Sequence, residues 1–377
     1  MTELIWPGKT QIKLSESSET NNSSGNVSHL SKILVTTEYI SPSIDIQQPT
    51  NLSTPTAPWY NRLILGDKQY VLPALVPEFA GKINLIYIDP PFMTGRDFKS
   101  GEQLAYSDKW GNNLDVYLQW LYETFALLYQ LLAPTGSLYL HLDWRMTHYA
   151  KVLLDEIFGF NVNAEGPGFK NEIIWHYRSG GRTHKRYARK HDTILFYTKS
   201  ARYSFHPERI SERRGAGKRN HMRKEVDSNG RINWTISSHG RTYSYGEDSL
   251  MTPSDVWSDI SHLHQKDPER KGYATQKPTA LVERIILASS EEEDLVFDCF
   301  CGSGITPLTA QQLGRRWIAC DSSELAITTT RARLVSAARI SPFIMQKLAD
   351  DPLATGEHPS SDIIGYTGRE TNNQSAS

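Results

Sequence analysis

The stretch LIYIDPPFMTG, residues 85–95, ends an apolar run with a carboxylate, two prolines and an aromatic residue that we expect to be exposed. Pro90 and Pro91 fix the backbone and lack N–H groups, so their carbonyls and the Asp89 carboxylate form a group of acceptors without a donor. Such a group would hold the two hydrogens of an amine, and Phe92 could stack on a flat ring. An amine on a flat ring describes a nucleobase, although these four residues alone are equally consistent with an ordinary turn.

A second group of candidate residues lies in LVFDCFCGSGITPLTAQQLGRRWIACD, residues 295–321. Gly302 and Gly304 permit a tight turn and the close approach of a ligand, and the helix predicted after them offers free N–H groups. Asp321 ends the next predicted strand, where a carboxylate can accept both hydroxyls of a ribose. These features predict a cofactor that contains a nucleoside.

The charge near this turn narrows the class of cofactor. The third glycine of a dinucleotide-binding Gly-X-Gly-X-X-Gly motif is absent, because position 307 is proline. Asp298 faces the turn, and a carboxylate there suits a positively charged amine and disfavours a pyrophosphate. We therefore expect S-adenosylmethionine. A purely structural turn and a nicotinamide-dependent oxidoreductase are the alternatives, and no His, Lys or Tyr acid–base set supports the second.

Both groups need a sheet whose strand ends meet at one edge. In an open α/β sheet, ligands bind beyond the carboxyl ends of the strands, where Asp89 and Asp298 both fall. The alternation of apolar runs with helical patterns favours an α/β protein with a doubly wound, mainly parallel sheet. Strands are predicted at 62–67, 83–89, 137–143, 171–177, 191–199, 294–300 and 315–321. Helices are predicted at 114–136, 145–159, 279–290 and 306–314, with a helix or turn at 68–81.

Composition separates this body from its flanks. Residues 1–57 are rich in Ser, Thr, Asn and Pro and are predicted to form a mostly disordered arm, and residues 346–377 a disordered tail. Between them we expect a catalytic half at 58–200, a small irregular insert at 201–252 and a cofactor-binding half at 253–345.

Charge is distributed unevenly along the chain. The net charge is −1, yet residues 170–224 hold 16 Lys and Arg against 4 Asp and Glu. A neutral protein with one strongly basic segment is expected to bring one face to a polyanion, and a solvated basic surface is the alternative.

The cysteine content and the hydropathy of the chain indicate the cellular compartment in which we expect the protein. Cys299, Cys301 and Cys320 are too few for a disulfide scaffold, and their spacing matches no zinc site, so we expect no metal. No apolar run approaches the roughly 18 residues of a membrane span, and the N-terminus lacks a signal-peptide pattern. We therefore expect a soluble, cytoplasmic protein without a membrane partner.

Taken in order, these motifs resemble the amino-methyltransferases of DNA, in the β-class arrangement. In that arrangement the catalytic motif precedes the target-recognition segment and the cofactor motif follows it. The resemblance covers roughly residues 60–335 and departs from the family at Cys299, where Pro is usual. It rests on LILGD, DPPFMTGRDF, FKNEIIWHYRSGGRTHKRYARKHDTILFYTKS, YATQKPTALVERIILASS and FDCFCGSGITPLTA.

The resemblance implies roles for individual residues. The residues that would hold the target amine and stack on its base are Asp89, Pro90, Pro91 and Phe92. Those that would line the S-adenosylmethionine site are Asp298, Gly302 and Gly304 at its methionine end, Phe300 beside the adenine or the methionine, Asp321 at the ribose, Asp67 at the adenine, and Gln276, Lys277 and Pro278 on the opposite side. The transfer needs neither a metal nor a covalent enzyme intermediate.

Double-stranded DNA is the implied substrate, with the insert as the target-recognition segment. The target base must leave the duplex, and the loop at 93–110 is expected to close over it. The basic residues expected to hold phosphates are Arg178, Arg182, Lys185, Arg186, Arg189, Lys190, Arg213, Arg214, Lys218 and Arg219.

The target amine is expected to be N6 of adenine, because position 89 is Asp where cytosine enzymes often carry Ser. Methylation at N4 of cytosine and a catalytically inactive DNA-binding relative are the alternatives. A second copy of the chain and a separately acting restriction endonuclease are further partners that the resemblance allows.

Overall fold

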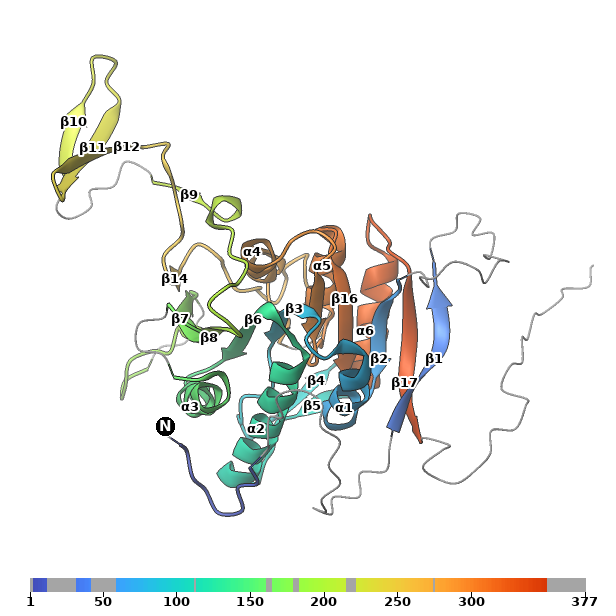
Figure 1. The fold of residues 1–377 in the computed structure, drawn as a ribbon. Coiled ribbons are helices and arrows are strands. Elements are labelled where there is room, and N and C mark those ends of the chain that lie inside the picture. Colours follow the sequence, from blue (N-terminus) through green and yellow to red (C-terminus); the bar gives the residue numbers. More distant parts are fainter. Residues whose placement is uncertain are drawn as a thin grey trace, which may run out of the picture.

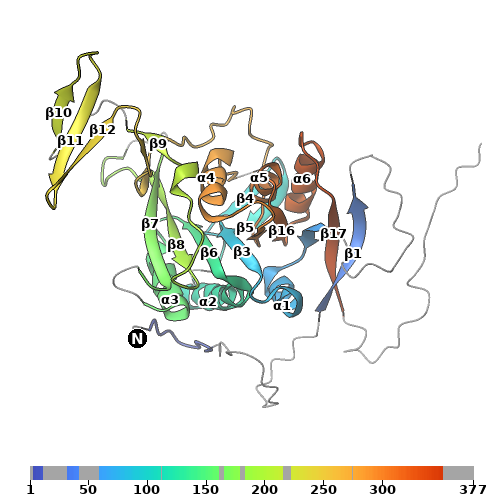
Figure 2. The same cartoon turned by 45° about the horizontal axis from the view of Figure 1, so that its top comes forward.

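The computed structural model describes residues 3–11, 32–41, 59–111, 113–160, 165–178, 183–214, 222–273 and 275–350. A 10-stranded, mainly parallel sheet crosses these residues, with helices on both faces (Figure 1, Figure 2). The predicted doubly wound α/β fold is therefore confirmed.

The neighbouring strands from β17 to β6 are all parallel, whereas β1 and β8 run antiparallel to the strands beside them. In spatial order the strands are β1 (Lys32–Ile40), β17 (Phe343–Asp350), β2 (Asn61–Leu65), β16 (Arg316–Asp321), β15 (Leu295–Asp298), β3 (Ile83–Ile88), β6 (Leu132–Leu142), β8 (His191–Thr198), β7 (Gly168–His176) and β14 (Val256–Trp257).

Helices cover the sheet because its central strands are apolar on both faces. On β3, Ile86 and Ile88 point to one hydrophobic cluster, and Leu85 and Tyr87 point to the other. The first face carries α1 (Lys68–Phe79), α2 (Leu114–Leu131) and α3 (Thr147–Phe158). The second carries α4 (Thr279–Ser289), α5 (Ile305–Gln312) and α6 (Glu324–Val335).

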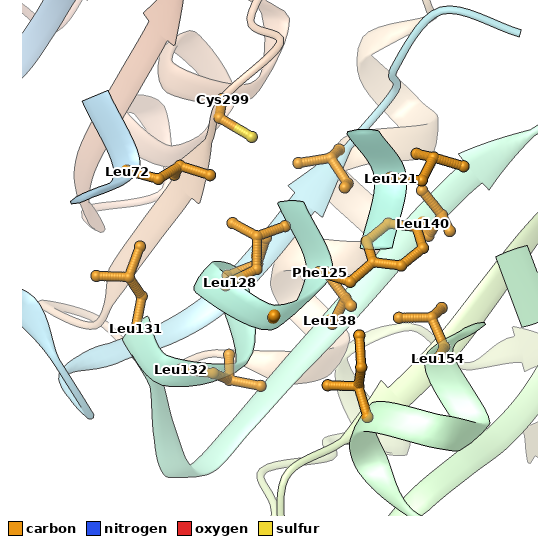
Figure 3. Close-up of a cluster of buried hydrophobic side chains, with 14 of the residues drawn as sticks. Leu72, Leu121, Phe125, Leu128, Leu131, Leu132, Leu138, Leu140, Leu154 and Cys299 are labelled. Carbon is orange, nitrogen blue, oxygen red and sulfur yellow. The ribbon is translucent and has the colours of Figure 1, made fainter. Parts of the chain in front are cut away.

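The cluster under α1, α2 and α3 is a continuous apolar layer (Figure 3). Leu72 of α1, Leu128 of α2 and Leu154 of α3 are fully buried, and each such leucine contributes roughly 1.5–3 kcal/mol. Cys299, directly after β15, is buried in the same cluster and also lines the cavity described below. The cluster therefore provides a rigid base for the strand ends that carry the candidate site.

The segment predicted as an irregular insert is partly regular, which corrects the expectation for 201–252. A three-stranded antiparallel sheet projects from the body in Figure 1. Its strands are β10 (Arg223–Val226), β11 (Ile232–Ser238) and β12 (Arg241–Gly246), and nearby lie η1 (Pro207–Arg209), β9 (Glu212–Arg213) and β13 (Leu250–Met251). Most of its side chains are exposed or half-buried, so the apolar alternation that predicts strands is weak.

The flanks also differ from the prediction. Trp6 is buried, and Lys9 Nζ lies 2.8 Å from Glu156 Oε1, so residues 3–11 pack on the body. Strand β1 pairs with β17, which continues to Asp350, past the predicted start of the tail. These partners lie about 300 positions apart in sequence, so no local pattern could reveal them. The remaining parts of the predicted arm and tail, 1–2, 12–31, 42–57 and 351–377, lie outside the described residues.

One helix end and one loop also differ from the prediction. The helix predicted to reach residue 136 ends at Leu131, because pairing with β3 begins at Leu132. A short hairpin, β4 (Asp97–Ser100) and β5 (Gln103–Ser107), occupies the loop expected at 93–110.

Candidate active site

The carboxyl ends of β2, β16, β15 and β3 lie side by side and deliver a carboxylate each. Asp67, Asp321, Asp298 and Asp89 all line one cavity of about 840 Å³. The other predicted residues that line it are Pro91, Gln276, Lys277, Phe300 and Gly302. Pro90, Phe92, Pro278 and Gly304 are not among the lining residues and lie next to ones that are.

The Asp89 carboxylate is bonded on one side only. Its Oδ2 atom accepts a hydrogen bond from Lys277 Nζ at 2.5 Å. Its Oδ1 atom is buried and has no hydrogen-bond partner among the described residues. The carbonyl of Pro91 accepts a bond from the Tyr117 hydroxyl at 2.6 Å, so a donor from outside the corner already occupies one of its acceptors.

Phe92 is half-buried, which corrects the expectation of an exposed ring. Its ring stacks on His141, with centroids 6.1 Å apart and planes 19° apart. Lys277 Nζ lies 5.2 Å from the same ring. The Phe92 ring therefore lies near Lys277, the side chain that bonds Asp89 Oδ2.

The Gln-Lys-Pro segment serves two different purposes. Lys277 binds Asp89, a partner 188 positions away that the motif alone did not reveal. The Gln276 amide accepts bonds from Lys271 N and Arg333 Nη2 and donates to Glu269 O. Gln276 therefore holds its own loop in place, and Pro278 precedes α4.

The turn after β15 needs both of its glycines. Gly302 and Gly304 have φ angles of 47° and 77°, which favour glycine. A Cβ on Gly304 would come within 2.6 Å of Thr330 Oγ1, and one on Gly302 within 3.1 Å of Tyr273 Cε1. Asp321 accepts bonds from Gly302 N and Ser323 N, both at 2.9 Å, and so fixes the turn to the end of β16.

Asp298 is bonded on both sides. Its Oδ1 atom accepts from Phe300 N at 2.9 Å, and its Oδ2 atom accepts from Thr306 Oγ1 at 2.6 Å. Burial raises the pKa of Asp298 to about 7, and burial raises the pKa of Asp321 to about 6. Because burial disfavours a lone negative charge, a cationic ligand in the cavity would stabilise both carboxylates.

The cavity is also lined by Lys68 and Trp120, which the sequence reasoning missed. Lys68 is buried, its Nζ lies 4.4 Å from the Trp120 ring centroid, and burial lowers its pKa to about 8. Trp120 packs 5.5 Å from Phe300, and Asp67 caps α1 through Gln69 N. Lys68 follows Asp67 directly, but a lysine at a helix start reads as a surface residue until the fold buries it.

The segment 83–331 matches the family model for DNA methylases, N6_N4_Mtase, which is more than half of the chain. The chain belongs to this DNA methylase family. It is a DNA amino-methyltransferase, as the resemblance predicted. The family includes enzymes that modify N6 of adenine and enzymes that modify N4 of cytosine.

Individual relatives agree with the family. The type II methyltransferase M.HpaI of Haemophilus parainfluenzae is 29% identical over 255 residues, which are 67% of this chain and 68% of M.HpaI. The DNA adenine methyltransferase YhdJ of Escherichia coli K12 is 27% identical over 271 residues, 71% of this chain and 82% of YhdJ.

Solved structures are more distant. The PvuII DNA methyltransferase, titled cytosine-N4-specific, is 19% identical with a TM-score of 0.49, over 74% of this chain and 88% of its own. The complex of M1.HpyAVI with SAM is 19% identical with a TM-score of 0.45, over 72% of this chain and 98% of its own.

The basic residues predicted to bind phosphates in this DNA methylase differ in their exposure. Arg178, Lys185, Arg186 and Arg189 are exposed, and Lys190 is half-buried. Arg213 is exposed and pairs with Asp248 at 3.1 Å. Arg214 is buried over the Trp234 ring, so its predicted role at a phosphate does not fit its position. Arg182, Lys218 and Arg219 lie outside the described residues.

The described residues of the methylase contain no cluster of three His, Cys, Asp or Glu side chains suited to a metal ion. Among the same residues, no helix has the length and apolar character needed to cross a membrane.

Proposed function

We propose that this DNA methylase transfers a methyl group from S-adenosylmethionine to the N6 amine of an adenine rotated out of double-stranded DNA. The observation that carries the proposal is the Asp89 carboxylate, in which buried Oδ1 has no partner among the described residues while Lys277 holds Oδ2. A buried acceptor left without a donor costs about 1–3 kcal/mol. A base amine entering the cavity supplies that donor.

The residues at the ends of β15 and β16 fit S-adenosylmethionine. Two carboxylates, that of buried Asp298 and that of half-buried Asp321, line the cavity, and this cofactor carries positive charge. The space kept free by Gly302 lets a ligand approach the backbone, and Phe300 and Asp67 line the same cavity. When bound, the cofactor supplies an electrophilic methyl group.

The chain's own groups prepare the amine. Asp89 Oδ1 and the Pro90 carbonyl accept its two hydrogens, which draws the nitrogen lone pair out of the aromatic ring. Lys277 keeps the carboxylate in one orientation through Oδ2, and Tyr117 fixes the next carbonyl, that of Pro91. Preorganised acceptors of this kind act mainly by orientation and by electrostatic stabilisation. The amine proton leaves during or after the transfer along the bond to Asp89 Oδ1.

The base reaches Asp89 only after it leaves the duplex, which costs a few kcal/mol. Phe92, supported from behind by His141, offers a ring on which the extruded base stacks. The β4–β5 hairpin lines the same cavity with residues 103–107 and takes the place of the closing loop predicted at 93–110.

DNA phosphates meet the exposed cations of the loop before β8. There the Arg189 guanidinium lies 3.4 Å from the Trp144 ring centroid, and Lys185 and Arg186 are exposed beside it. Trp144 follows Asp143 directly after β6, at the same edge of the sheet as Asp89. The sheet of β10, β11 and β12 is the target-recognition element, with exposed Arg223, Lys224 and Arg241.

Adenine is favoured over cytosine by the carboxylate at position 89 and by the adenine specificity in the name of the relative YhdJ. The test is expression of the chain in a host without DNA methylation, followed by sequencing that distinguishes modified bases. N6-methyladenine at one recurring sequence is expected, and the Asp89→Ala variant at equal expression is the matched control. N4-methylcytosine at that sequence would overturn the adenine assignment, and unmodified DNA would overturn the proposal.

A further inference from the structure

A second buried carboxylate, Asp108, lies beside the catalytic corner. It is fully buried and follows the last strand of the β4–β5 hairpin. Its Oδ1 atom accepts bonds from Met93 N at 2.9 Å and Trp110 Nε1 at 3.1 Å. Its Oδ2 atom accepts bonds from Thr94 N and Thr94 Oγ1, both at 2.7 Å. These four bonds use the full accepting capacity of a carboxylate.

Two backbone hydrogen bonds join the same two segments, the one after Phe92 and the one around Asp108. Gly95 N donates to Asp108 O at 3.0 Å, and Asp108 N donates to Arg96 O at 2.8 Å. The segment directly after Phe92 is therefore attached to Asp108 through both main chain and side chain.

Met93 shows why this attachment matters. Its φ angle is 57°, in the left-handed region that a non-glycine residue adopts at a cost of about 1–3 kcal/mol. Such a conformation persists only where surrounding contacts impose it, and Asp108 accepts the Met93 N–H. Because Met93 follows Phe92, its conformation sets the direction in which the corner leaves β3.

The hairpin on the other side of Asp108 reaches the cofactor end of the cavity. Ala105 is buried against Tyr273 and Ala326, and Tyr106 lines the cavity. The Tyr106 hydroxyl lies 3.5 Å from Thr275 Oγ1, two positions before Lys277. Asp108 thus stands between the strand that faces the cofactor and the corner that faces the base.

We propose that Asp108 is a positioning residue, whose hydrogen bonds couple the position of the β4–β5 hairpin to the positions of Asp89 and Phe92. The part of the cavity that binds the base and the part that binds the cofactor then form together. The inference rests on the proposed function, since it concerns how the same site is assembled. Asp108 contacts neither substrate and acts through Met93 and Thr94.

The test is Asp108→Asn, which keeps the shape of the side chain. In this variant an amide N–H₂ group replaces one carboxylate oxygen and faces donors that an oxygen accepts from in the wild type. Single-turnover transfer at saturating cofactor and DNA is expected to fall about 100-fold, the loss expected of a displaced catalytic group. The dissociation constant for S-adenosylmethionine is expected to change less than about threefold, because the side-chain bonds of Asp108 go to Met93, Thr94 and Trp110 and not to the turn after β15. Fluorescence of 2-aminopurine at the target position, which reports base extrusion, is expected to lose its response to cofactor.

The matched control is Asp97→Asn on the same hairpin, where an exposed carboxylate pairs with Lys109 and Ser107. This variant is expected to match the wild type in all three measurements. Thr94→Val removes one donor to Asp108 and tests the idea should the Asn variant not fold, with an expected loss of about tenfold, worth one hydrogen bond.

Two outcomes overturn the inference. One is an Asp108→Asn enzyme with wild-type transfer and extrusion, and the other is parallel loss of cofactor affinity and rate, which indicates a structural role only. Failure of the wild type to methylate any DNA would instead overturn the proposed function, so the two failures are distinguishable.

Discussion

The corner after β3 and the turn after β15 end adjacent parallel strands and each begin with aspartate, yet their carboxylates are used differently. Both oxygens of Asp298 accept bonds, from Phe300 N of its turn and from Thr306 Oγ1 of α5, whereas Oδ1 of Asp89 has no partner among the described residues. A position at the edge of the sheet therefore does not distinguish a group that handles substrate from one that shapes the backbone. The distinction comes from the carboxylate oxygen that has no hydrogen-bond partner among the described residues.

The backbones of the corner and of the turn also differ in the hydrogen-bond donors that they offer. Pro90 and Pro91 remove N–H donors from the corner, while Gly302 turns its N–H toward Asp321. The corner is consequently rich in acceptors, the property on which the proposed amine site rests. The turn, by contrast, is held by hydrogen bonds to the carboxylates of Asp298 and Asp321. Burial raises the pKa of both groups, so ionising them without a cationic ligand costs free energy.

The largest effect expected from this difference is at the corner. Asp89→Ala should lower the single-turnover rate of methyl transfer by at least about 10³-fold, as for loss of a preorganised polar group. Cofactor affinity should stay within about threefold of wild type, because the turn is untouched. Labelled cofactor and rapid quench measure the rate, and calorimetry measures the affinity. Transfer that survives in this variant would break the comparison.

Lys277→Met should give the next largest loss, about 100-fold in the same rate, because Asp89 loses the bond that orients it. The methionine keeps the apolar part of the side chain near Phe92. Lys271→Met, an exposed lysine on the same loop, is the control and should be close to wild type. Equal losses in both variants would mean that the loop, and not the ion pair, supports catalysis.

Cofactor affinity should depend on pH through the turn. Burial raises the pKa of Asp298 to about 7, so most of this carboxylate is neutral at pH 6 and charged at pH 8. A cationic cofactor prefers the charged form, so binding should be about tenfold weaker at pH 6 than at pH 8. Titration calorimetry across this range checks the trend, and Asp298→Asn should flatten it. A pH-independent affinity would show that Asp298 does not meet the charge of the cofactor.

The smallest effect concerns stability without cofactor. A carboxyl group whose pKa is raised in the folded state stabilises the protein at low pH and loses that contribution as pH rises from about 4 to 7. Asp298→Asn keeps partners for Phe300 N and Thr306 and carries no charge. At pH 8 its melting temperature should therefore exceed that of the wild type by a few degrees, roughly the effect of 1 kcal/mol. A melting temperature below that of the wild type at pH 8 would show instead that the ionised Asp298 carboxylate stabilises the folded state.

Much of the site could be predicted from sequence because it depends on local motifs at strand ends. Asp89, Asp298 and Asp321 each follow an apolar run that reads as a strand, and in a parallel sheet such ends meet at one edge. What could not be predicted are the partners: Lys277 on Asp89, His141 behind Phe92, and Asp108 behind Met93. These contacts join residues from about 15 to about 190 positions apart, and no local pattern records them.

The same distinction applies to the fold. Short continuous apolar runs predict the β3, β15 and β16 strands, since each is buried on both faces of the sheet. Strand β1, by contrast, exists only through its pairing with β17 at the edge of the sheet.

The amino-acid sequence by itself determined the order of motifs, the mainly parallel sheet and the chemistry of an acceptor corner beside a glycine turn. Only the tertiary structure decided which carboxylate keeps a free oxygen, that Arg214 is buried, and that Lys68 faces the cavity. The physical reason is that hydrogen-bond satisfaction and burial are properties of neighbours in space. A residue type specifies how many bonds it can make, and the fold specifies which of them remain for a substrate.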